Sequence, residues 1–205
     1  MSFSLSASPL STSPLLKKML DRRGLSDAAA AELFLAPDYE RDTHDPFLLK
    51  DMDKAVDRIL SAIEKGERIV IYSDYDADGI PGAVVLHDFF KKIGFTNFEN
   101  YIPDRHAEGF GVNVGAVEAI ASRGVTLMIT IDCGIVDVAP IARAKELGID
   151  TIITDHHEPN GETPPAFAIV NPKQADCQYP FKFLCGAGVI FKLVQALIAK
   201  KRALT

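Results

Sequence analysis

A short apolar run that leads into three acidic residues constrains the fold of this chain more than any other feature. The run covers Ile69 to Tyr72, and carboxylates follow at alternate positions, at Asp74, Asp76 and Asp78. A brief apolar stretch bounded by polar residues is typical of a buried strand in a parallel sheet. Carboxylates so close together repel one another, which predicts a bound cation after the strand. A surface turn rich in Asp is the alternative.

The remainder of the chain alternates between strand-like and helix-like segments. Strands are predicted at residues 68–73, 98–102, 126–131, 150–154 and 167–170, and helices at 51–65, 83–93, 113–122, 136–147 and 186–200. In the last helix, the expected apolar face consists of Val189, Phe191, Leu193, Val194, Leu197 and Ile198. Strands separated by helices of about 10–15 residues indicate βαβ units. The sequence therefore predicts an α/β fold with a mostly parallel, twisted, Rossmann-like sheet that helices flank on both faces.

The N-terminal part of the chain has a different pattern. Short helices are predicted after residues 13–14 and after residues 26–27, and a loop is predicted over residues 37–46. We expect residues 1–50 to form an extension with a small helical cap. We expect residues 51–205 to form the main domain.

Composition limits the classes of function. The 205 residues carry a net charge of −6, which argues against a general basic nucleic-acid-binding protein. A nuclease is not excluded, because metal ions and a few local cations can bind phosphate. No apolar run approaches the ~20 residues of a membrane span, and residues 1–14 lack the features of a signal peptide. Three cysteines without zinc-type spacing indicate reduced thiols, so we expect a cytoplasmic protein. We also expect no membrane partner, since no membrane span is predicted, and we expect a monomer.

Residues that can bind metal ions follow three of the predicted strands. After the run Asp74 to Asp78, Asp132 follows a second strand, and Asp155, His156 and His157 follow a third. In parallel sheets, ligands bind beyond the carboxyl ends of the strands. Carboxylates with one or two imidazoles suit Mn²⁺ or Mg²⁺ better than structural zinc. So many hard ligands suit a pair of ions, an arrangement that hydrolyses phosphodiesters or phosphoanhydrides.

Three motifs at these positions resemble those of a known family. They read D-Y-D-A-D-G at 74–79, I-T-I-D-C-G at 129–134 and T-D-H-H at 154–157, and they are similar to the first three motifs of the DHH phosphoesterase superfamily. Longer stretches at 44–56, 101–113, 170–173 and 185–193 resemble one branch of it, the RecJ family of single-stranded-DNA exonucleases. The resemblance extends from about Pro14 to Ala199 and is specific because the motifs occur in this order.

The resemblance implies metal-binding and catalytic roles at the matching positions. The implied metal ligands are Asp74, Asp76, Asp78, Asp132, Asp155 and His156, with Asp132 bridging two ions of Mn²⁺ or Mg²⁺. The implied catalytic residues are Asp132, His156 and His157. His157 is expected to orient the substrate phosphate or a water molecule bound to the metal.

Four further residues are candidates for contact with the substrate. Arg105 and His106 lie in a loop that the family places near the metal centre. Arg is a bidentate phosphate donor, so phosphate contact is one interpretation, and a solvated loop cation is the other. Gly186 and Gly188, at the start of a helix, either offer backbone N–H groups to phosphate or allow the helix to pack closely on the sheet.

The resemblance also implies a function. It implies a metal-dependent 5′→3′ exonuclease that acts on single-stranded DNA in DNA repair and recombination. The family's fourth metal-binding motif and its DHHA1-type domain are not found after Lys200, so we expect a truncated chain with weak activity. Two alternatives stay open. One is a phosphoesterase of the same superfamily that cleaves short oligonucleotides, cyclic dinucleotides or pyrophosphate, and the other is a non-catalytic binding module.

Overall fold

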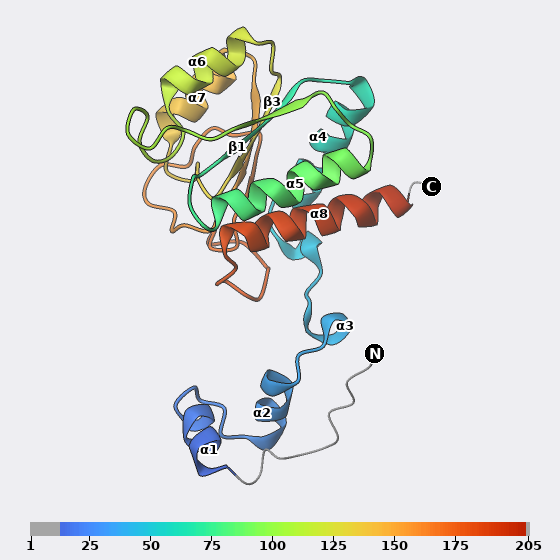
Figure 1. Cartoon of the computed structure of the whole chain (residues 1–205), viewed down its shortest axis with the longest axis vertical. Coiled ribbons are helices and arrows are strands. Elements are labelled where there is room, and N and C mark those ends of the chain that lie inside the picture. Colours follow the sequence, from blue (N-terminus) through green and yellow to red (C-terminus); the bar gives the residue numbers. More distant parts are fainter. Residues whose placement is uncertain (1–12, 204–205) are drawn as a thin grey trace. The chain divides into compact units, whose positions relative to one another are not determined.

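The computed structural model describes residues 13–203 and divides the chain into two compact units, residues 1–43 and 44–205 (Figure 1). Residues 44–49 belong to the second unit because they contribute to that unit's core. Leu49 is buried there beside Met52, and a 3₁₀ helix at Pro46–Leu48 leads into it. Residues 1–12, where no signal peptide is expected, lie outside the described residues.

Three short helices make up the described part of the first unit. They are α1 (Pro14–Asp21), α2 (Ala28–Leu35) and α3 (Tyr39–Asp42). The hydroxyl of Ser13 accepts the N–H of Leu16 at 3.4 Å, and the carboxylate of Asp27 accepts the N–H of Ala30 at 2.9 Å. These side chains cap the first two helices, which confirms the predicted starts. The third helix lies in the segment predicted as a loop, and a cap on the main domain stays a prediction.

The second unit is built on a five-stranded parallel sheet in the order β2-β1-β3-β4-β5, which confirms the predicted α/β class. The strands are β1 (Ile69–Ser73), β2 (Phe98–Tyr101), β3 (Leu127–Ile131), β4 (Asp150–Thr154) and β5 (Ala168–Val170). The register pairs Ser73 with Ile131, and Ile131 with Thr154. Because β1, β3 and β4 end at the same level, the residues that follow them meet at one edge, called here the carboxyl edge.

Helices cover both faces of this sheet. On one face lie α4 (Met52–Lys65), α5 (Gly79–Lys92) and α8 (Gly186–Ala203), and on the other lie α6 (Val114–Ser122) and α7 (Val138–Glu146) (Figure 1). Ile69 and Ile71 of β1 pack with the first group, and Val70 and Tyr72 pack with the second. Burial on both faces explains why this strand is apolar throughout.

Helix α5 begins at Gly79, earlier than the predicted start at residue 83. Pro81 is compatible with this start because the first turn of a helix has N–H groups without intrahelical partners. A Cβ at Gly79 would lie 2.5 Å from the carbonyl oxygen of Asp74, and one at Gly82 would lie 2.7 Å from Cγ2 of Ile131. Only glycine therefore allows the helix to begin so close to β1, directly after Asp78.

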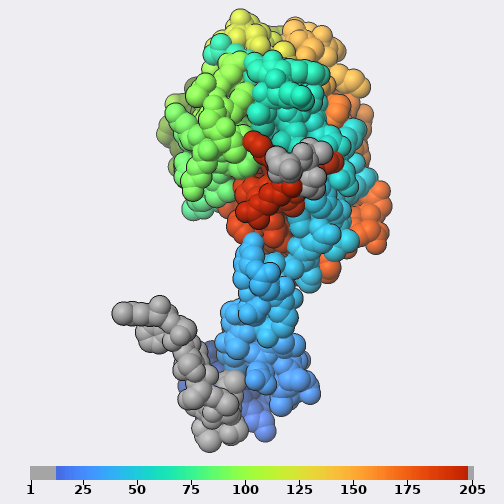
Figure 2. Space-filling view, turned by 90° about the vertical axis from the view of Figure 1, so that its right-hand side faces the viewer, coloured from blue at the N-terminus to red at the C-terminus, as the bar shows by residue number. Residues whose placement is uncertain are grey.

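Helix α8 packs along α5 and presents part of its length at the surface, where it is red in Figure 2. Its buried face differs from the predicted one. Phe191 and Ile198 are 43% and 39% exposed, whereas Lys192 is buried. The Lys192 ammonium donates to the carbonyl of His44 at 2.7 Å and to Gln195 Oε1 at 2.8 Å, which makes its burial possible. Neither α8 nor any other described helix has the length and apolarity needed to cross a membrane.

An ion-pair network closes the opposite edge of the sheet, called here the amino edge. The guanidinium of Arg58, on α4, donates to Asp150 at 2.7 Å and to Glu67 at 2.7 Å. Glu67 also accepts the hydroxyl of Thr126 at 2.8 Å. These contacts join α4 to Asp150, the first residue of β4, and to Glu67 and Thr126, which shortly precede β1 and β3.

Candidate metal centre

The backbone carries three acidic residues from the strand ends to the carboxyl edge. Asp74, Asp132 and Asp155 directly follow β1, β3 and β4. Each extends the ladder by one hydrogen bond: their N–H groups donate to the carbonyls of Ile131, Thr154 and Val170 at 3.1, 2.9 and 3.2 Å, in that order. The predicted convergence of the three strand ends therefore occurs, and the carboxylates are held on a rigid backbone.

Asp132 has the least favourable environment of these acids. Its side chain is buried, and Oδ1 has no hydrogen-bond partner. Burial, and then the charges of Asp78 and Asp76, raise the pKa of Asp132 to about 8. Its backbone is left-handed, with φ of 62°, which costs on the order of 1 kcal/mol. A buried carboxylate oxygen without a donor requires an explanation, and a cation would supply one.

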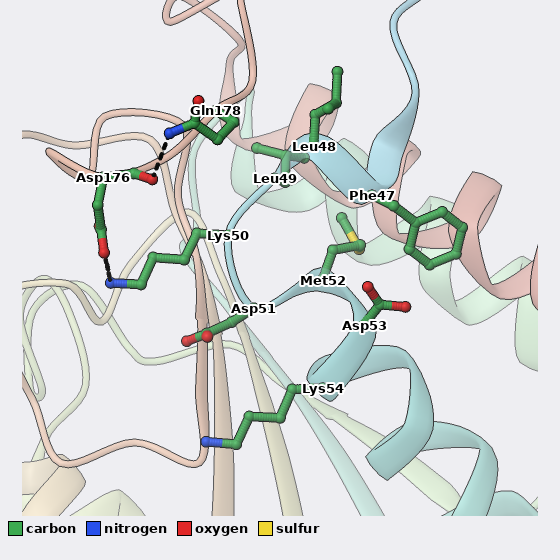
Figure 3. A pocket seen from close by; sticks show the side chains of 10 residues that line it. All are labelled: Phe47, Leu48, Leu49, Lys50, Asp51, Met52, Asp53, Lys54, Asp176 and Gln178. Atoms are coloured by element: carbon green, nitrogen blue, oxygen red, sulfur yellow. Dashed lines mark hydrogen bonds and ion pairs between the residues drawn. The ribbon is translucent and has the colours of Figure 1, made fainter.

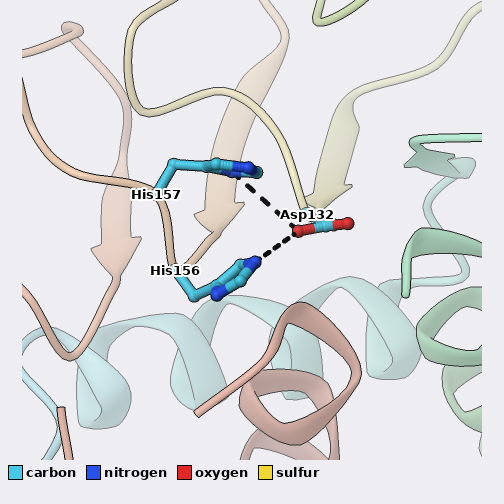
Figure 4. Close-up of side chains that lie close together, drawn as sticks. All are labelled: Asp132, His156 and His157. Carbon is cyan, nitrogen blue, oxygen red and sulfur yellow. Dashed lines mark ion pairs between the residues drawn. The ribbon is translucent and has the colours of Figure 1, made fainter. Parts of the chain in front are cut away.

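Imidazole nitrogens approach this oxygen from the loop after β4 (Figure 4). His156 Nε2 lies 3.1 Å from Asp132 Oδ1 and 3.5 Å from Asp78 Oδ2. The short contact to Asp132 lacks the alignment of a hydrogen bond, since Oδ1 remains without a partner. His157 Nδ1 lies 3.9 Å from the same oxygen. Asp132 and the two histidines thus place potential ligand atoms around a common point.

The described residues form two groups that could hold a metal ion. One group is Asp132, His156 and His157, and the other is Asp74, Asp76 and Asp132. Within each group the ligand atoms lie within 4.8 Å of one another. Asp132 belongs to both groups, which is the position of a carboxylate that bridges two ions. Carboxylates and imidazoles are donors that suit Mn²⁺ and Mg²⁺, so the residues present fit the predicted ions.

Asp78 is held by the start of helix α8. Its carboxylate accepts the N–H of Gly186 at 2.6 Å and the N–H of Ala187 at 2.7 Å. The Gly186 N–H, a candidate donor to phosphate, is therefore bonded to Asp78, and the Gly188 N–H lies 3.4 Å from Cys185 Sγ. A Cβ at Gly186 would lie 2.6 Å from Asp132 Oδ1, so close packing explains this glycine.

Asp76 is held by the first turn of α5. Its Oδ1 accepts the N–H groups of Gly79 and Asp78 at 2.9 and 2.7 Å. These two bonds lower the pKa of Asp76. The pKa of Asp74, by contrast, is raised by burial. The three acids at alternate positions therefore have different environments, although they share one loop.

Asp155 lies behind His157 and outside both groups of potential ligands. It accepts Nδ1–H of His157 at 2.7 Å, the N–H groups of His156 and His157 at 2.7 and 3.1 Å, and the N–H of Ile135 at 3.0 Å. Burial acts to raise the pKa of Asp155, but the bonds from His157 and Ile135 lower it overall. These bonds orient the His157 ring. In metal sites, a neighbouring carboxylate commonly orients a histidine ring in this way.

Arg105 and His106 lie on the exposed loop between β2 and α6, and neither belongs to the two ligand groups. The Arg105 guanidinium lies 4.8 Å from the centre of the Tyr75 ring. Tyr75 separates Asp74 from Asp76, so this cation–π contact holds a positive charge beside the acids. The His106 backbone N–H donates to Asp104 at 2.8 Å.

Sequence reasoning missed two aromatic residues at this site. Tyr75 supports Arg105, and Phe110 lies against His157, with ring centres 6.0 Å apart. Periodicity could not find them because both lie outside the regular elements. The available signal was a large apolar residue, Phe110, placed between two glycines in a polar loop.

A separate pocket of about 410 Å³ lies at the start of α4 (Figure 3). Its charged groups have partners: Lys50 Nζ lies 2.9 Å from Asp176 Oδ1, and Asp51 accepts the N–H of Ile169 at 3.1 Å. It shares no residue with the two ligand groups. The metal centre contains a buried carboxylate oxygen without a hydrogen-bond partner, whereas these carboxylates of the pocket are paired.

Comparison with known families agrees with this geometry. A family model described as the DHH family, N-terminal domain, matches residues 68–205. The chain belongs to the DHH family. The matched region of this DHH chain begins one residue before β1 and includes every residue of both ligand groups.

Similar proteins carry the name RecJ. The single-stranded-DNA-specific exonuclease RecJ of Bacillus subtilis (strain 168) is 49% identical to this DHH chain over 192 residues, which cover 93% of the chain and 24% of that relative. A crystal structure of exonuclease RecJ bound to manganese has a TM-score of 0.68 and 34% identity, and covers 75% of this chain and 38% of its own. RecJ of Thermus thermophilus in complex with Mn²⁺ has a TM-score of 0.66 and 28% identity, and covers 89% and 24%. The chain thus spans about a quarter of the length of the Bacillus relative.

Proposed function

We propose that this chain is the nuclease domain of a RecJ-type exonuclease and hydrolyses phosphodiester bonds of single-stranded DNA with two ions of Mn²⁺ or Mg²⁺. The observation that carries the proposal is the buried oxygen of Asp132, which has no hydrogen-bond partner and belongs to two groups of potential ligands. The relatives named single-stranded-DNA-specific exonuclease, and the related structures bound to Mn²⁺, support the same assignment.

Particular residues would hold the two ions. Asp74 and Asp76 would hold one, His156 would hold the other together with Asp78, and Asp132 would bridge them. Such a pair of ions activates water and stabilises charge on the attacking and leaving oxygens of a phosphate. The N–H groups at the start of α8 fix the direction of the Asp78 carboxylate.

The remaining side chains would position the DNA. Asp155 fixes the ring of His157, which is only partly buried and can therefore reach a phosphate oxygen. Arg105, held over Tyr75, would contact a neighbouring phosphate through its guanidinium. His106 lies in the same exposed loop and is a weaker candidate for such a contact. Fixed positions for these groups reduce the cost of orienting the substrate.

The experiment uses the purified chain with Mn²⁺ and, in parallel, end-labelled single-stranded DNA, a dinucleotide and pyrophosphate. Weak release of mononucleotides from DNA is expected, with loss of release in Asp132→Asn and retention in Asp88→Asn, an exposed acid of α5. Cleavage of the small substrates alone would instead indicate a small-substrate phosphoesterase. Binding of Mn²⁺ or DNA without turnover would indicate a non-catalytic module, and either result would overturn the proposal.

We also propose that degradation proceeds 5′→3′, that the chain serves DNA repair and recombination, and that it acts as a cytoplasmic monomer. The polarity and the process are supported by the resemblance to the RecJ family. The three free cysteines are consistent with a reducing compartment. DNA blocked at its 5′ end should resist degradation, whereas DNA blocked at its 3′ end should not. Light scattering tests the monomer.

A further inference from the structure

Phe110 is an exposed aromatic residue at the metal centre. It lies on the loop between β2 and α6, and it is 55% exposed. Its ring centre lies 6.0 Å from that of His157, and the two rings are nearly perpendicular, at 83°. More than half of a large apolar residue therefore faces solvent beside the histidine that is expected to orient phosphate.

The backbone on the C-terminal side of Phe110 is fixed by buried groups. The carbonyl of Gly111 accepts the hydroxyl of Tyr72 at 2.9 Å, and the N–H of Val112 donates to Asp137 at 2.8 Å. Gly111 has φ of 80°, and a Cβ there would lie 2.9 Å from the Asp137 carboxylate oxygens. Only glycine fits this position, so the loop has little freedom to withdraw Phe110 from solvent.

The N-terminal side of the loop is fixed as well. The carboxylate of Glu108 accepts the N–H of Asp104 at 2.8 Å and the hydroxyl of Tyr101. Gly109, which precedes Phe110, has φ of 79°. The loop therefore holds Phe110 outward from both sides, and the exposure of its ring is a property of the fold.

A second His–Phe pair in the protein shows what a structural contact looks like. His87 meets Phe98 at 5.0 Å, but Phe98 is half-buried and also packs against Phe90 and Phe95 of the core. Among the described residues, the ring contact found for Phe110 is with His157. Phe110, by contrast, stays exposed, so a purely structural role in supporting His157 does not explain the position of its ring.

We propose that Phe110 stacks on a base of one of the two nucleotides that flank the phosphate at His157, an inference that rests on the proposed function. The base and phosphate of one nucleotide are separated by one sugar, which matches a ring adjacent to the histidine. Stacking on aromatic side chains is how proteins hold single-stranded nucleic acid without reading its sequence. Phe110 would thus place the terminal nucleotide by its base while His157 holds the phosphate.

The test removes either the aromatic ring or the base. The full chain and its variants Phe110→Leu, Phe110→Trp and Phe191→Leu are measured with thymidine tetranucleotides that are intact or abasic at the first or second nucleotide. Phe191 is an exposed phenylalanine of α8 outside the metal centre, so its variant is the matched control. Binding is measured by fluorescence anisotropy, and kcat and KM are measured with Mn²⁺.

We expect loss of one flanking base to weaken binding by the unmodified chain about tenfold, within the range for stacking on an aromatic residue. Phe110→Leu should lose about the same factor on intact DNA and nothing further on the abasic DNA, through KM more than kcat. Phe110→Trp should restore binding, and Phe191→Leu should match the unmodified chain.

Two results would overturn the inference alone. One is equal weakening of intact and abasic DNA by Phe110→Leu, which would mean that the ring only supports His157. The other is degradation of intact and abasic DNA by the unmodified chain with the same kcat/KM. Failure to bind or degrade any of these oligonucleotides would overturn the proposed function together with the inference.

Discussion

Among the described residues, acids gather at both edges of the sheet, but only at the amino edge does an arginine donate hydrogen bonds to them. At the amino edge, Glu67 and Asp150 are both bonded to Arg58 at 2.7 Å. At the carboxyl edge, Asp132 faces Asp76, Asp78 and two histidines, and one of its buried oxygens has no donor. The contacts at the amino edge stabilise the folded state, whereas the groups at the carboxyl edge are suited to bind a cation.

The pKa shifts of Glu67, at the amino edge, and Asp132, at the carboxyl edge, have opposite directions for this reason. The hydrogen bond from Arg58 lowers the pKa of Glu67, so its negative charge stabilises the folded state. Burial and neighbouring charges raise the pKa of Asp132 to about 8, so its negative charge opposes folding until a cation binds. The same residue types therefore contribute in opposite ways to stability, depending on their partners.

Asp132→Asn would remove the unpaired carboxylate of the carboxyl edge, so it should have the largest effect of the changes considered. Asn tolerates the left-handed backbone at this position, so the fold should be retained. Hydrolysis should fall at least about 100-fold, the upper end of the loss seen when a partner of a metal ligand is removed. The metal-free variant should gain on the order of 2 kcal/mol in free energy of unfolding at pH 7, because folding no longer has to protonate this carboxyl or bury its charge. Rate assays and urea unfolding measure both, and a less stable variant would contradict this account.

Adding Mn²⁺ should change the carboxyl edge and leave the amino edge unaffected. At an ion concentration 100 times the dissociation constant, the free energy of unfolding should rise by about 2.7 kcal/mol. Arg58→Met should keep this gain, whereas Asp132→Asn should lose it. Urea unfolding with and without Mn²⁺ measures the effect, and an equal gain in all three proteins would show that the ion binds elsewhere.

Arg58→Met would remove the cation of the amino edge. The side chains of Arg58 and Glu67 are 13% and 19% exposed, so the loss at pH 7 should be about 2 kcal/mol of unfolding free energy. The pKa of Glu67 is lowered from 4.5, so the contribution is present above about pH 4.5 and is lost as the pH falls below the folded-state value. The difference between the variant and the unmodified chain should therefore shrink as the pH falls below about 4.5.

The matched control for this change is Arg143→Met. Arg143 pairs with Glu118 and Glu146 on the surface, where both acids are at least half exposed. Its loss should cost less than about 1 kcal/mol at every pH. If both arginine variants behaved alike in urea unfolding, the amino edge would have no special stabilising role.

Gly186→Ala should sharpen the comparison with the smallest effect. Its Cβ would lie 2.6 Å from Asp132 Oδ1, so the methyl group would displace a carboxylate of the metal centre. We expect about a tenfold loss of Mn²⁺ affinity, measured by calorimetry. Gly188→Ala is the control, because its Cβ would meet the side chains of Leu184 and Cys185 at the ordinary distances of 3.4 and 3.7 Å, and the same helix would be modified. Equal losses in both variants would indicate a general effect on α8.

The sheet and the convergence of acids at its carboxyl edge were predictable because both depend on local patterns. The apolar run at β1 marks a strand buried on both faces, and Asp74, Asp132 and Asp155 directly follow strands whose ends must align in a parallel sheet. The starts of α1 and α2 were predictable as well, since Ser13 and Asp27 are capping residues. In each case a residue acts on neighbours within a few positions in the chain.

The features that were missed depend on contacts between distant segments. Asp78 is bonded to Gly186 and Ala187, which follow it by more than a hundred residues. Because of this contact, the N–H of Gly186 donates to a carboxylate and is not available to a phosphate. Lys192 is buried in α8 because the carbonyl of His44 accepts a hydrogen bond from its ammonium group, which no helical periodicity could indicate. The early start of α5 depends on how closely Gly82 can approach Ile131.

The sequence by itself determined that this chain folds into a parallel α/β sheet with carboxylates and imidazoles at one edge, because strand periodicity and strand ends are local properties. The tertiary structure alone decided which partners and which degree of burial each of those groups has. It left a buried oxygen of Asp132 without a donor, engaged Asp155 with His157, engaged Asp78 with α8, and held Phe110 outward. Such roles follow from the direction in which each side chain points, and packing between segments far apart in the chain sets that direction.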